Sequence, residues 1–348
     1  MAGIGVRLNK IFGRNTLTTN MIGFFYSTLV TVAPMFAIII NLVLMEYFLK
    51  FSTLGYAQRE LFSCTILYTF IFSLLTASPF NAVLSRYISD VIYEERYQDI
   101  LPCYHIGMML NIVLSCLVGI PFCLWEHFVG GVSVAYVFAG FWCYISLVFV
   151  FYSMIYLSIC KDYQRIAQYY IVGMLVAFFL SLFLRYICHW GITQSMLAAM
   201  DAGFFLTAVL ENALVKRYFR KNSNRYKPVL SYFKMYWQLV VTNFLYILGL
   251  YVHNFVFWTT DMRMVVVDSF VCNQPYDMAS CLAMFTNISA TIIFIARVEM
   301  YFHEKYKLYS EAVIGGRGAD IQNAKKRMFR QLASELMTLA RIQFIISV

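Results

Sequence analysis

The sequence predicts an all-α polytopic membrane protein, and three observations lead to that prediction. Hydrophobic residues make up 61% of the 348 residues and charged residues only 13%, whereas about a quarter of a soluble domain is charged. The mean hydropathy is +0.67. The apolar residues are gathered in blocks of about 20 residues, the length of a helix that crosses the hydrocarbon core of a bilayer.

Eight apolar blocks are long enough to span the bilayer, and a ninth begins near the end of the sequence. The predicted spans are 21–49, 61–86, 103–124, 131–160, 168–188, 192–215, 231–259, 279–301 and a stretch from about 334 onward. The sequence stops inside the last block, so we expect it to be C-terminally incomplete. A short re-entrant or interfacial helix is the alternative.

The spans and the charges between them predict four segments. Residues 1–20 carry apolar and basic side chains on adjoining helical faces, which is typical of an amphipathic segment on the cytoplasmic membrane surface; a simple basic flank is the alternative. Residues 21–215 form a first six-helix transmembrane bundle. Residues 216–230 are a basic cytoplasmic linker, and residues 231–348 are a partial second transmembrane bundle.

The positions of the basic residues predict the orientation. If the N-terminus is cytoplasmic, 21 of the 27 Lys and Arg residues fall in inward-facing segments and four in outward-facing ones. This is the charge bias that orients membrane proteins. The net charge of +9 therefore reflects topology and gives no reason to expect a nucleic-acid partner.

The sequence lacks the motifs of several functional classes. It has no phosphate-binding glycine loop, no nucleophile-elbow serine motif and no helical zinc-protease motif, so we expect neither an enzyme nor a bound cofactor. The nine cysteines do not follow the spacing of a metal site. Cys272 and Cys281 flank a predicted outer loop, but spacing alone leaves open whether they form a disulfide.

Two acidic residues lie within the sixth predicted span and are candidates for the transport path. Asp201 lies among small residues, roughly 12 Å of helix from the outer end. It is expected either to line a hydrophilic path or to form a structural hydrogen bond with a neighbouring helix. Glu211 lies near the inner end, one turn before Lys216, where we expect a snorkelling structural pair in preference to transport chemistry.

Uncharged polar residues and prolines add further candidates. Asn41, Asn81 and Asn111 lie inside predicted spans and are expected either to line a sugar-binding cavity or to hydrogen-bond between helices. Pro34 and Pro79 interrupt the first two spans and predict kinks, which suit either alternating access or a purely structural bend.

The stretch that follows the eighth span carries charges at helical spacing. Arg297, Glu304 and Glu311 share one stripe, and Lys307 lies one turn before Glu311. This pattern predicts a helix that leaves the membrane as a charged rod and breaks at the glycine pair 315–316. It is either a plain membrane-exit helix or a surface that also docks a synthase.

Four stretches carry a resemblance to a known family. They read MAGIGVRLNK, SPFNAVLSRYISDVIYEERY, CNQPYDMASCLAMFTN and ARVEMYFHEKYKLYSEAVIGG, the last followed by DIQNAKKRMFRQLASELMTLARIQFIISV. Along the whole chain, and most strongly after about residue 270, the sequence resembles the PelG family of inner-membrane transporters of the bacterial Pel exopolysaccharide system. It departs from the pattern at VAPMF, around Pro34, and by ending within the ninth span.

The resemblance implies a fold, a function and partners. It implies a flippase of the multidrug/oligosaccharidyl-lipid/polysaccharide superfamily, with a MATE-like two-bundle architecture whose first bundle is complete here and whose second is truncated. It implies export of an amino-sugar-rich cationic polymer across the inner membrane for the biofilm matrix. The implied partners are a soluble cytoplasmic glycosyltransferase, a membrane component that senses cyclic di-GMP, and other Pel membrane proteins.

Two other functions remain open at this point. A drug or cation antiporter of the same superfamily would move small organic cations. A non-transporting membrane scaffold would hold a polysaccharide synthase through its charged cytoplasmic segments. A cationic polymer favours an acidic path, for which Asp201 is the main candidate.

Overall fold

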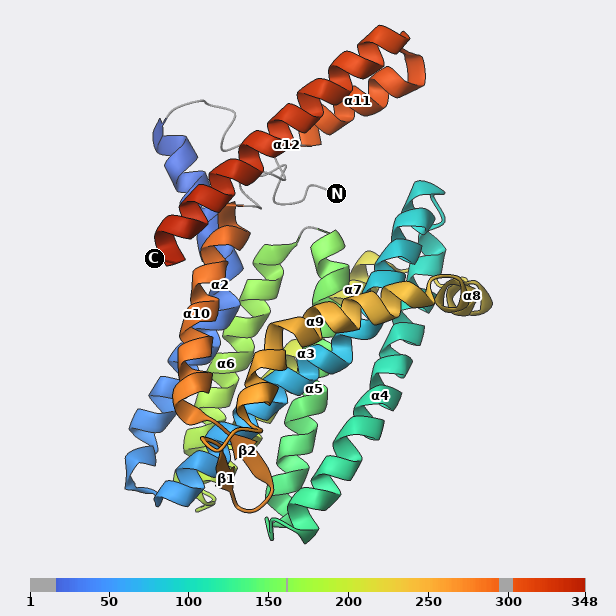
Figure 1. Cartoon of the computed structure of the whole chain (residues 1–348). Coiled ribbons are helices and arrows are strands. Elements are labelled where there is room, and N and C mark those ends of the chain that lie inside the picture. Colours follow the sequence, from blue (N-terminus) through green and yellow to red (C-terminus); the bar gives the residue numbers. More distant parts are fainter. Residues whose placement is uncertain (1–16, 161, 294–302, 348) are drawn as a thin grey trace. The chain divides into compact units, whose positions relative to one another are not determined.

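A computed structural model describes residues 17–160, 162–293 and 303–347, and almost all of them are helical (Figure 1). The elements are α2 (Leu17–Phe48), α3 (Tyr56–Tyr93), α4 (Ile100–Phe128), α5 (Val134–Ile159), α6 (Tyr163–Tyr186), α7 (Ile192–Tyr218), α8 (Lys227–Met235), α9 (Trp237–Phe257), β1 (Met264–Val266), β2 (Phe270–Cys272), α10 (Gln274–Ile293), α11 (His303–Gly315) and α12 (Gly318–Ser347). Single 3₁₀ turns, Phe51–Thr53 and Tyr97–Asp99, precede α3 and α4.

Six of these helices are long and apolar enough to cross a membrane. They are α3, α4, α5, α6, α7 and α9. The part of α2 with described side chains, Val32–Phe48, is a shorter apolar helix. The all-α polytopic class predicted from composition is therefore confirmed, and the chain is a multi-pass membrane protein. The two-bundle arrangement stays a prediction.

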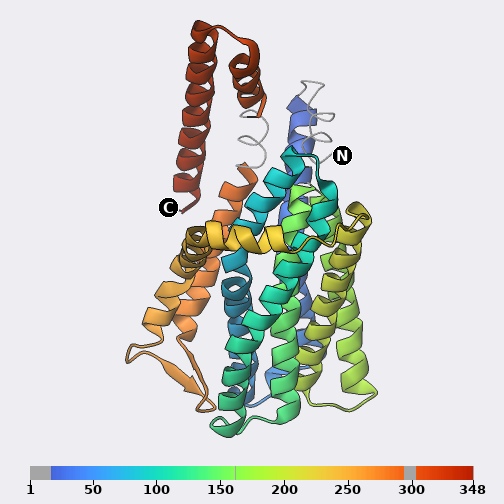
Figure 2. The same ribbon diagram turned by 90° about the vertical axis from the view of Figure 1, so that its right-hand side faces the viewer.

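The described residues divide into two compact units. One is Ala33–Gln274, and the other combines the described parts of Met1–Val32 and Pro275–Val348. In the first unit, α7 packs against both α5 and α6, and α3 packs against α4, α5 and α9. Figure 2 shows the long helices of this unit running roughly parallel, with short connections at their ends.

Two hydrophobic clusters fill the first unit. One, near the end where α3 meets α4, contains the buried tyrosines Tyr87, Tyr104, Tyr152, Tyr156 and Tyr170. Tyr152 donates a hydrogen bond to the Tyr104 carbonyl at 2.8 Å, and its hydroxyl lies 2.9 Å from that of Tyr156. The second cluster lies toward the other ends of the helices and combines aliphatic side chains such as Met45, Leu197 and Met200 with the aromatic rings of Phe62 and Phe204.

The predicted span 231–259 is two helices instead of one. α8 is amphipathic: Val229 is fully buried, whereas Leu230 and Lys234 are exposed. It lies across the ends of α3 and α4, seen end-on in Figure 1 and lengthwise in Figure 2. Tyr232 donates a hydrogen bond to Asp90 at 3.1 Å, and burial and this bond raise the Tyr232 pKa. A helix with one polar face is more stable along a membrane surface than across it.

The second unit contains an antiparallel helix pair, and its first helix is the charged helix that the sequence predicts. α11 and α12 pack against each other and are joined at Gly316 and Arg317. α11 ends at Gly315, as the glycine pair predicts. α12 is a single helix of 30 residues, so its charged first half and its apolar second half are continuous and no separate helix begins near residue 334.

Candidate functional site

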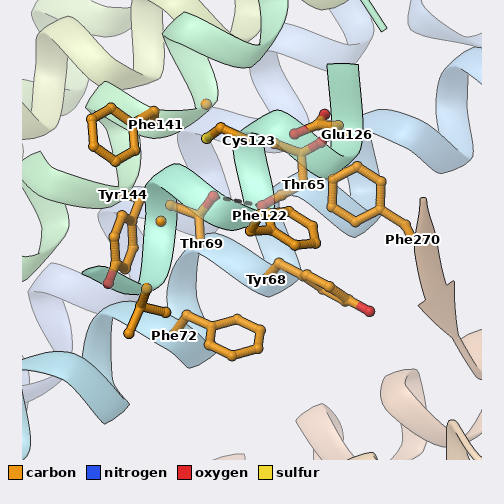
Figure 3. A pocket seen from close by; sticks show the side chains of 13 residues that line it. Thr65, Tyr68, Thr69, Phe72, Phe122, Cys123, Glu126, Phe141, Tyr144 and Phe270 are labelled. Carbon is orange, nitrogen blue, oxygen red and sulfur yellow. Dashed lines mark hydrogen bonds between the residues drawn. The ribbon is translucent and has the colours of Figure 1, made fainter. Parts of the chain in front are cut away.

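A cavity of about 280 Å³ lies between α3, α4 and α5, in the half of the first unit that carries the β1–β2 hairpin (Figure 3). Its lining residues are Thr65, Tyr68, Thr69, Phe72, Val118, Gly119, Phe122, Cys123, Glu126, Gly140, Phe141, Tyr144 and Phe270. Pockets for small molecules measure roughly 300–1,000 Å³, so this cavity fits a ligand of about one ring.

Aromatic rings make up much of the wall, and Tyr68 is at the centre of the group. Its ring lies 5.0 Å from that of Phe270 and 5.6 Å from that of Phe122, measured between centroids. Behind it, Trp258 stacks on Tyr68 at 4.9 Å with an angle of 15° between the rings. Rigid aromatic surfaces of this kind bind the apolar faces of sugar rings and also attract cations.

The hydroxyl of Tyr68 attaches the β hairpin to α3. It donates a hydrogen bond to the Val271 carbonyl at 2.7 Å and accepts one from the Val271 amide at 3.1 Å. Since Val271 is the middle residue of β2, these bonds hold the strand, and with it Phe270, against the cavity. A residue from the connection after α9 thus becomes part of a wall formed by α3, α4 and α5.

Hydroxyl groups provide hydrogen-bonding atoms along the α3 and α5 walls. Thr69 donates to the Thr65 carbonyl at 2.6 Å, and the Thr65 hydroxyl lies 3.0 Å from that of Tyr136. The hydroxyl of Tyr144 lies 2.6 Å from the hydroxyl of Thr76. Each hydroxyl has a partner that fixes its direction and still has lone pairs with which to accept bonds from a ligand.

Glu126 is the one acidic residue among the described residues that line the cavity. It comes from the last turn of α4, is only 5% exposed, and its Oε1 atom has no hydrogen-bond partner in the part of the chain that the structure describes. Its ionisable neighbours are Cys123, on the same helix, and Tyr136 of α5. In the view of Figure 3 it lies on the side of Phe270, opposite Phe141 and Tyr144.

A comparison with known protein families identifies the family of the chain. The sequence model of the PelG family, described as "Putative exopolysaccharide Exporter (EPS-E)", matches residues 1–348. The chain belongs to the PelG family. The family resemblance found in the sequence is thereby confirmed along the whole chain. No curated protein and no solved structure matches it.

The residues predicted for a transport path in this PelG-family chain lie outside the lining of the cavity. Asp201 is half-buried on α7 and accepts a hydrogen bond from Ser146 of α5 at 3.0 Å. This is a hydrogen bond to a neighbouring helix, the structural alternative that the sequence left open for Asp201. A role of Asp201 in transport stays a prediction.

The three asparagine candidates are also spread through the bundle. Asn41 is buried, and its Nδ2 contacts the sulfur atoms of Met174 and Met200 at 3.5 and 3.3 Å, which ties α2 to α6 and α7. Asn111 is fully buried and donates to the Gly107 carbonyl of its own helix at 2.8 Å. Asn81 is half-buried, and its Oδ1 is without a hydrogen-bond partner in the described residues.

Glu211 corrects an expectation from the sequence. It is fully buried on α7, both of its carboxyl oxygens lack a hydrogen-bond partner within the described segments, and no ion pair with Lys216 or Arg217 forms there. Its ionisable neighbours are Tyr104 of α4 and Tyr170 of α6. The prediction of a snorkelling pair is wrong, because this face of α7 packs into the tyrosine cluster.

Both predicted kink positions lie inside continuous helices. α2 continues through Pro34 and α3 through Pro79. Pro79 has no amide to donate to the Leu75 carbonyl, and the Ser78 hydroxyl donates to that oxygen instead, at 3.1 Å. The side-chain amide of Asn243 on α9 donates a hydrogen bond to the Ser78 carbonyl. This bond attaches α9 to α3 beside the proline.

The predicted docking residues lie in or near α11. Lys307 and Glu311 are both exposed, 3.9 Å apart, as their four-residue spacing predicts. The backbone of Glu304 belongs to α11, and Arg297 lies outside the described residues. Of the two outer-loop cysteines, Cys272 is buried in β2 in the cluster around Phe270, and Cys281 is exposed on α10, in the other unit.

Sequence reasoning did not select Glu126, and the reason is a helix boundary. The predicted third span ends at residue 124, which would place Glu126 in an outer loop, but α4 continues to Phe128. The signal that could have found it is the run FCLWEHF, in which an acid lies within one helical turn of aromatic residues on both sides. No group of three or more His, Cys, Asp or Glu side chains suited to a metal occurs within the described residues.

Proposed function

We propose that this chain exports the Pel polysaccharide, an amino-sugar-rich polymer, from the cytoplasm across the bacterial inner membrane during formation of the biofilm matrix. The observation that carries the proposal is the aromatic and hydroxyl-lined cavity between α3, α4 and α5, in a chain that matches the exporter family over residues 1–348. Sugar rings bind to proteins by stacking an apolar face on aromatic rings while hydroxyls accept hydrogen bonds.

The orientation belongs to the same proposal. The C-terminal ends of α3, α5 and α7 lie at one end of the first unit with α8, and the β hairpin lies at the other (Figure 2). The segments at the α8 end hold most of the basic residues, so we place them in the cytoplasm, with the N-terminus. The cavity then lies in the periplasmic half of the bilayer.

The proposed partners bind on the cytoplasmic side. They are a soluble glycosyltransferase that makes the polymer, the membrane component that senses cyclic di-GMP, and the other Pel membrane proteins. The charged and exposed α11–α12 pair supports such docking, because it presents alternating charges such as Lys307 and Glu311 on a rigid pair of helices.

A variant that fills the cavity tests this function. Gly140 lines the cavity, and a Cβ atom there would meet its nearest neighbour, Thr65 Cγ2, at an ordinary 3.6 Å. Gly140→Leu would therefore occupy the cavity without a clash at its first side-chain atom. In cells whose only copy is Gly140→Leu, we expect secreted amino-sugar polymer to fall at least about tenfold, because a loss of roughly 1.4 kcal/mol of binding free energy is a tenfold loss of affinity.

Gly249→Leu is the matched control, since Gly249 of α9 has open space around its Cβ position and does not line the cavity. Membrane levels of both variants are measured by immunoblot. If Gly140→Leu secretes normally while deletion of the whole chain abolishes secretion, the scaffold function is correct and the cavity is not the path.

A further inference from the structure

A second cavity, of about 640 Å³, lies where α2 ends and α3 begins. Its lining residues, all within the unit Ala33–Gln274, are Val43, Glu46, Tyr47, Phe51, Ser52, Tyr56, Arg59, Glu60, Ser63 and Gln274. The Tyr56 hydroxyl contacts the sulfur of Met264 in β1 at 3.2 Å, so the cavity lies at the hairpin end of the unit (Figure 1). It is separate from the cavity that we propose for export, and its volume suits a small molecule with several polar groups.

The wall of this cavity carries one guanidinium and two carboxyl groups that do not pair with one another. Arg59 forms no ion pair with Glu46 or Glu60 within the described segments. The Arg59 Nε atom is buried and has no hydrogen-bond partner there. Glu60 is only 6% exposed, and its carboxyl group is held in the wall by a hydrogen bond from Gln274 at 3.1 Å. Charged groups held apart in this way are best satisfied by a ligand that carries both opposite charges.

The start of α3 favours the anionic part of such a ligand. Gly55 precedes the helix and has no side chain to cap it, and the first turn contains no acidic residue. The unpaired amide groups and the dipole of a helix N-terminus attract a phosphate group. Arg59 belongs to the same first turn, and a guanidinium group binds phosphate through two parallel hydrogen bonds.

The wall formed by α2 places the ligand at the surface of a bilayer. Val43 and Tyr47 lie one turn apart near the end of this helix and are 58% and 78% exposed. An exposed apolar side chain followed by an exposed tyrosine is typical of the boundary between the hydrocarbon core and the head groups. Glu46 lies at this boundary too, so the cavity has an apolar side and a charged side and suits an amphipathic ligand.

We propose that this cavity binds a zwitterionic phospholipid head group, a phosphate joined to a primary ammonium group, as in phosphatidylethanolamine. Arg59 and the first amides of α3 bind the phosphate, and Glu46 and Glu60 bind the ammonium group. The acyl chains leave past Val43 into the hydrocarbon core. The inference needs only that the chain crosses a bilayer, and it holds for either orientation.

Native mass spectrometry of the purified full-length chain tests the inference, because it counts the lipid molecules that stay bound after detergent is removed. The probes are phosphatidylethanolamine and phosphatidylglycerol with the same acyl chains. Phosphatidylglycerol has the phosphate but no ammonium group. We expect phosphatidylethanolamine to bind about fivefold more tightly, the upper range for partly exposed ion pairs.

Two variants separate the two ends of the site. Arg59→Gln is expected to weaken the binding of both lipids at least about tenfold, because both lose the charged hydrogen bonds to phosphate. Glu46→Gln is expected to weaken the binding of phosphatidylethanolamine alone and to remove most of its preference. A general defect in the fold would not act on one lipid and spare the other.

The matched controls are Arg263→Gln and Asp261→Asn. Both residues are exposed in the connection between α9 and β1 and lie outside the lining of the cavity, so both affinities should stay unchanged. Size-exclusion profiles establish that each variant is folded. The inference is wrong if the unaltered chain binds the two lipids equally, or if folded Glu46→Gln keeps the full preference.

Free phosphoethanolamine distinguishes a lipid from a soluble source of the same head group. Binding much weaker than that of the lipid supports the lipid, since the acyl chains then add to the affinity. Binding as tight as that of the lipid overturns the membrane source in favour of a soluble phosphate ester.

Discussion

Glu126 and Glu211 both carry buried carboxyl groups on membrane-crossing helices, but the two groups differ in what surrounds them. Glu126 borders a cavity, so a ligand can reach it. Glu211 is packed in the tyrosine cluster between α4, α6 and α7, where both of its oxygens are without a hydrogen bond among the described residues. A polar group left unsatisfied in this way costs stability, typically about 1–3 kcal/mol.

The substitution Glu211→Met should therefore stabilise the protein. Methionine has a similar length and no polar atom to desolvate, so we expect the free energy of unfolding to rise by about 1–3 kcal/mol. Thermal unfolding in detergent measures the change. Leu214→Met, a buried site on the same helix, is the control and should change little, since the volume is kept. A fall in stability for Glu211→Met would mean that the carboxyl group has a partner in the folded protein.

At the scale of elements, α6 and α7 approach each other through two glycines. A Cβ atom on Gly203 would lie 2.7 Å from the Gly173 carbonyl oxygen, and one on Gly173 would lie 2.6 Å from the Gly203 oxygen. Gly203 is one of the small residues around Asp201, and here it allows the two helices to pack closely. Backbone atoms cannot move aside as a flexible side chain can, so any larger residue must separate the helices.

Gly203→Ala is therefore expected to destabilise the chain by about 1–3 kcal/mol, the usual cost of overpacking, although alanine is the better helix former. The lower midpoint would appear in a thermal melt of the purified protein. Gly249→Ala is the control, because nothing lies within 4 Å of the added atom. Equal midpoints for the two variants would contradict the close contact between α6 and α7.

Tyr68 of α3 makes two hydrogen bonds that hold the hairpin. Tyr68→Phe keeps the ring in the cavity wall but removes both hydrogen bonds to Val271. We expect β1 and β2 to detach more often, so that limited proteolysis cuts between residues 260 and 273 at least about fivefold faster, the effect of roughly 1 kcal/mol. Tyr93→Phe, on the exposed end of the same helix, should be cut at the original rate.

At the scale of the molecule, the alternation of the helices allows the proposed orientation to be tested. Cys188 is exposed between α6 and α7, on the side that we place in the periplasm. Residues 219–226, between α7 and α8, are placed in the cytoplasm. A membrane-impermeant maleimide added to intact cells should label Cys188 in a Cys281→Ser chain, and should not label Lys221→Cys in a background that carries both Cys188→Ser and Cys281→Ser. Labelling of Lys221→Cys in intact cells, with none at Cys188, would reverse the orientation.

The sequence by itself determined the class of the protein, its family and six of its long apolar helices. It could do so because the free energy of inserting a helix into a bilayer is nearly a sum over consecutive residues, which needs no knowledge of the other helices. The same local reasoning predicted the end of α11 at Gly315 and the spacing of Lys307 and Glu311.

Only the tertiary structure decided which polar residues meet. It buried Glu211, bonded Asp201 to Ser146, and brought Glu126 and Phe270 to one cavity although 144 positions separate them in the chain. The physical reason is that rotation about a helix axis, and the few residues by which a helix passes its predicted end, are set by packing against distant segments. A difference of four residues at the end of α4 was enough to move Glu126 from an expected loop into the wall of the cavity.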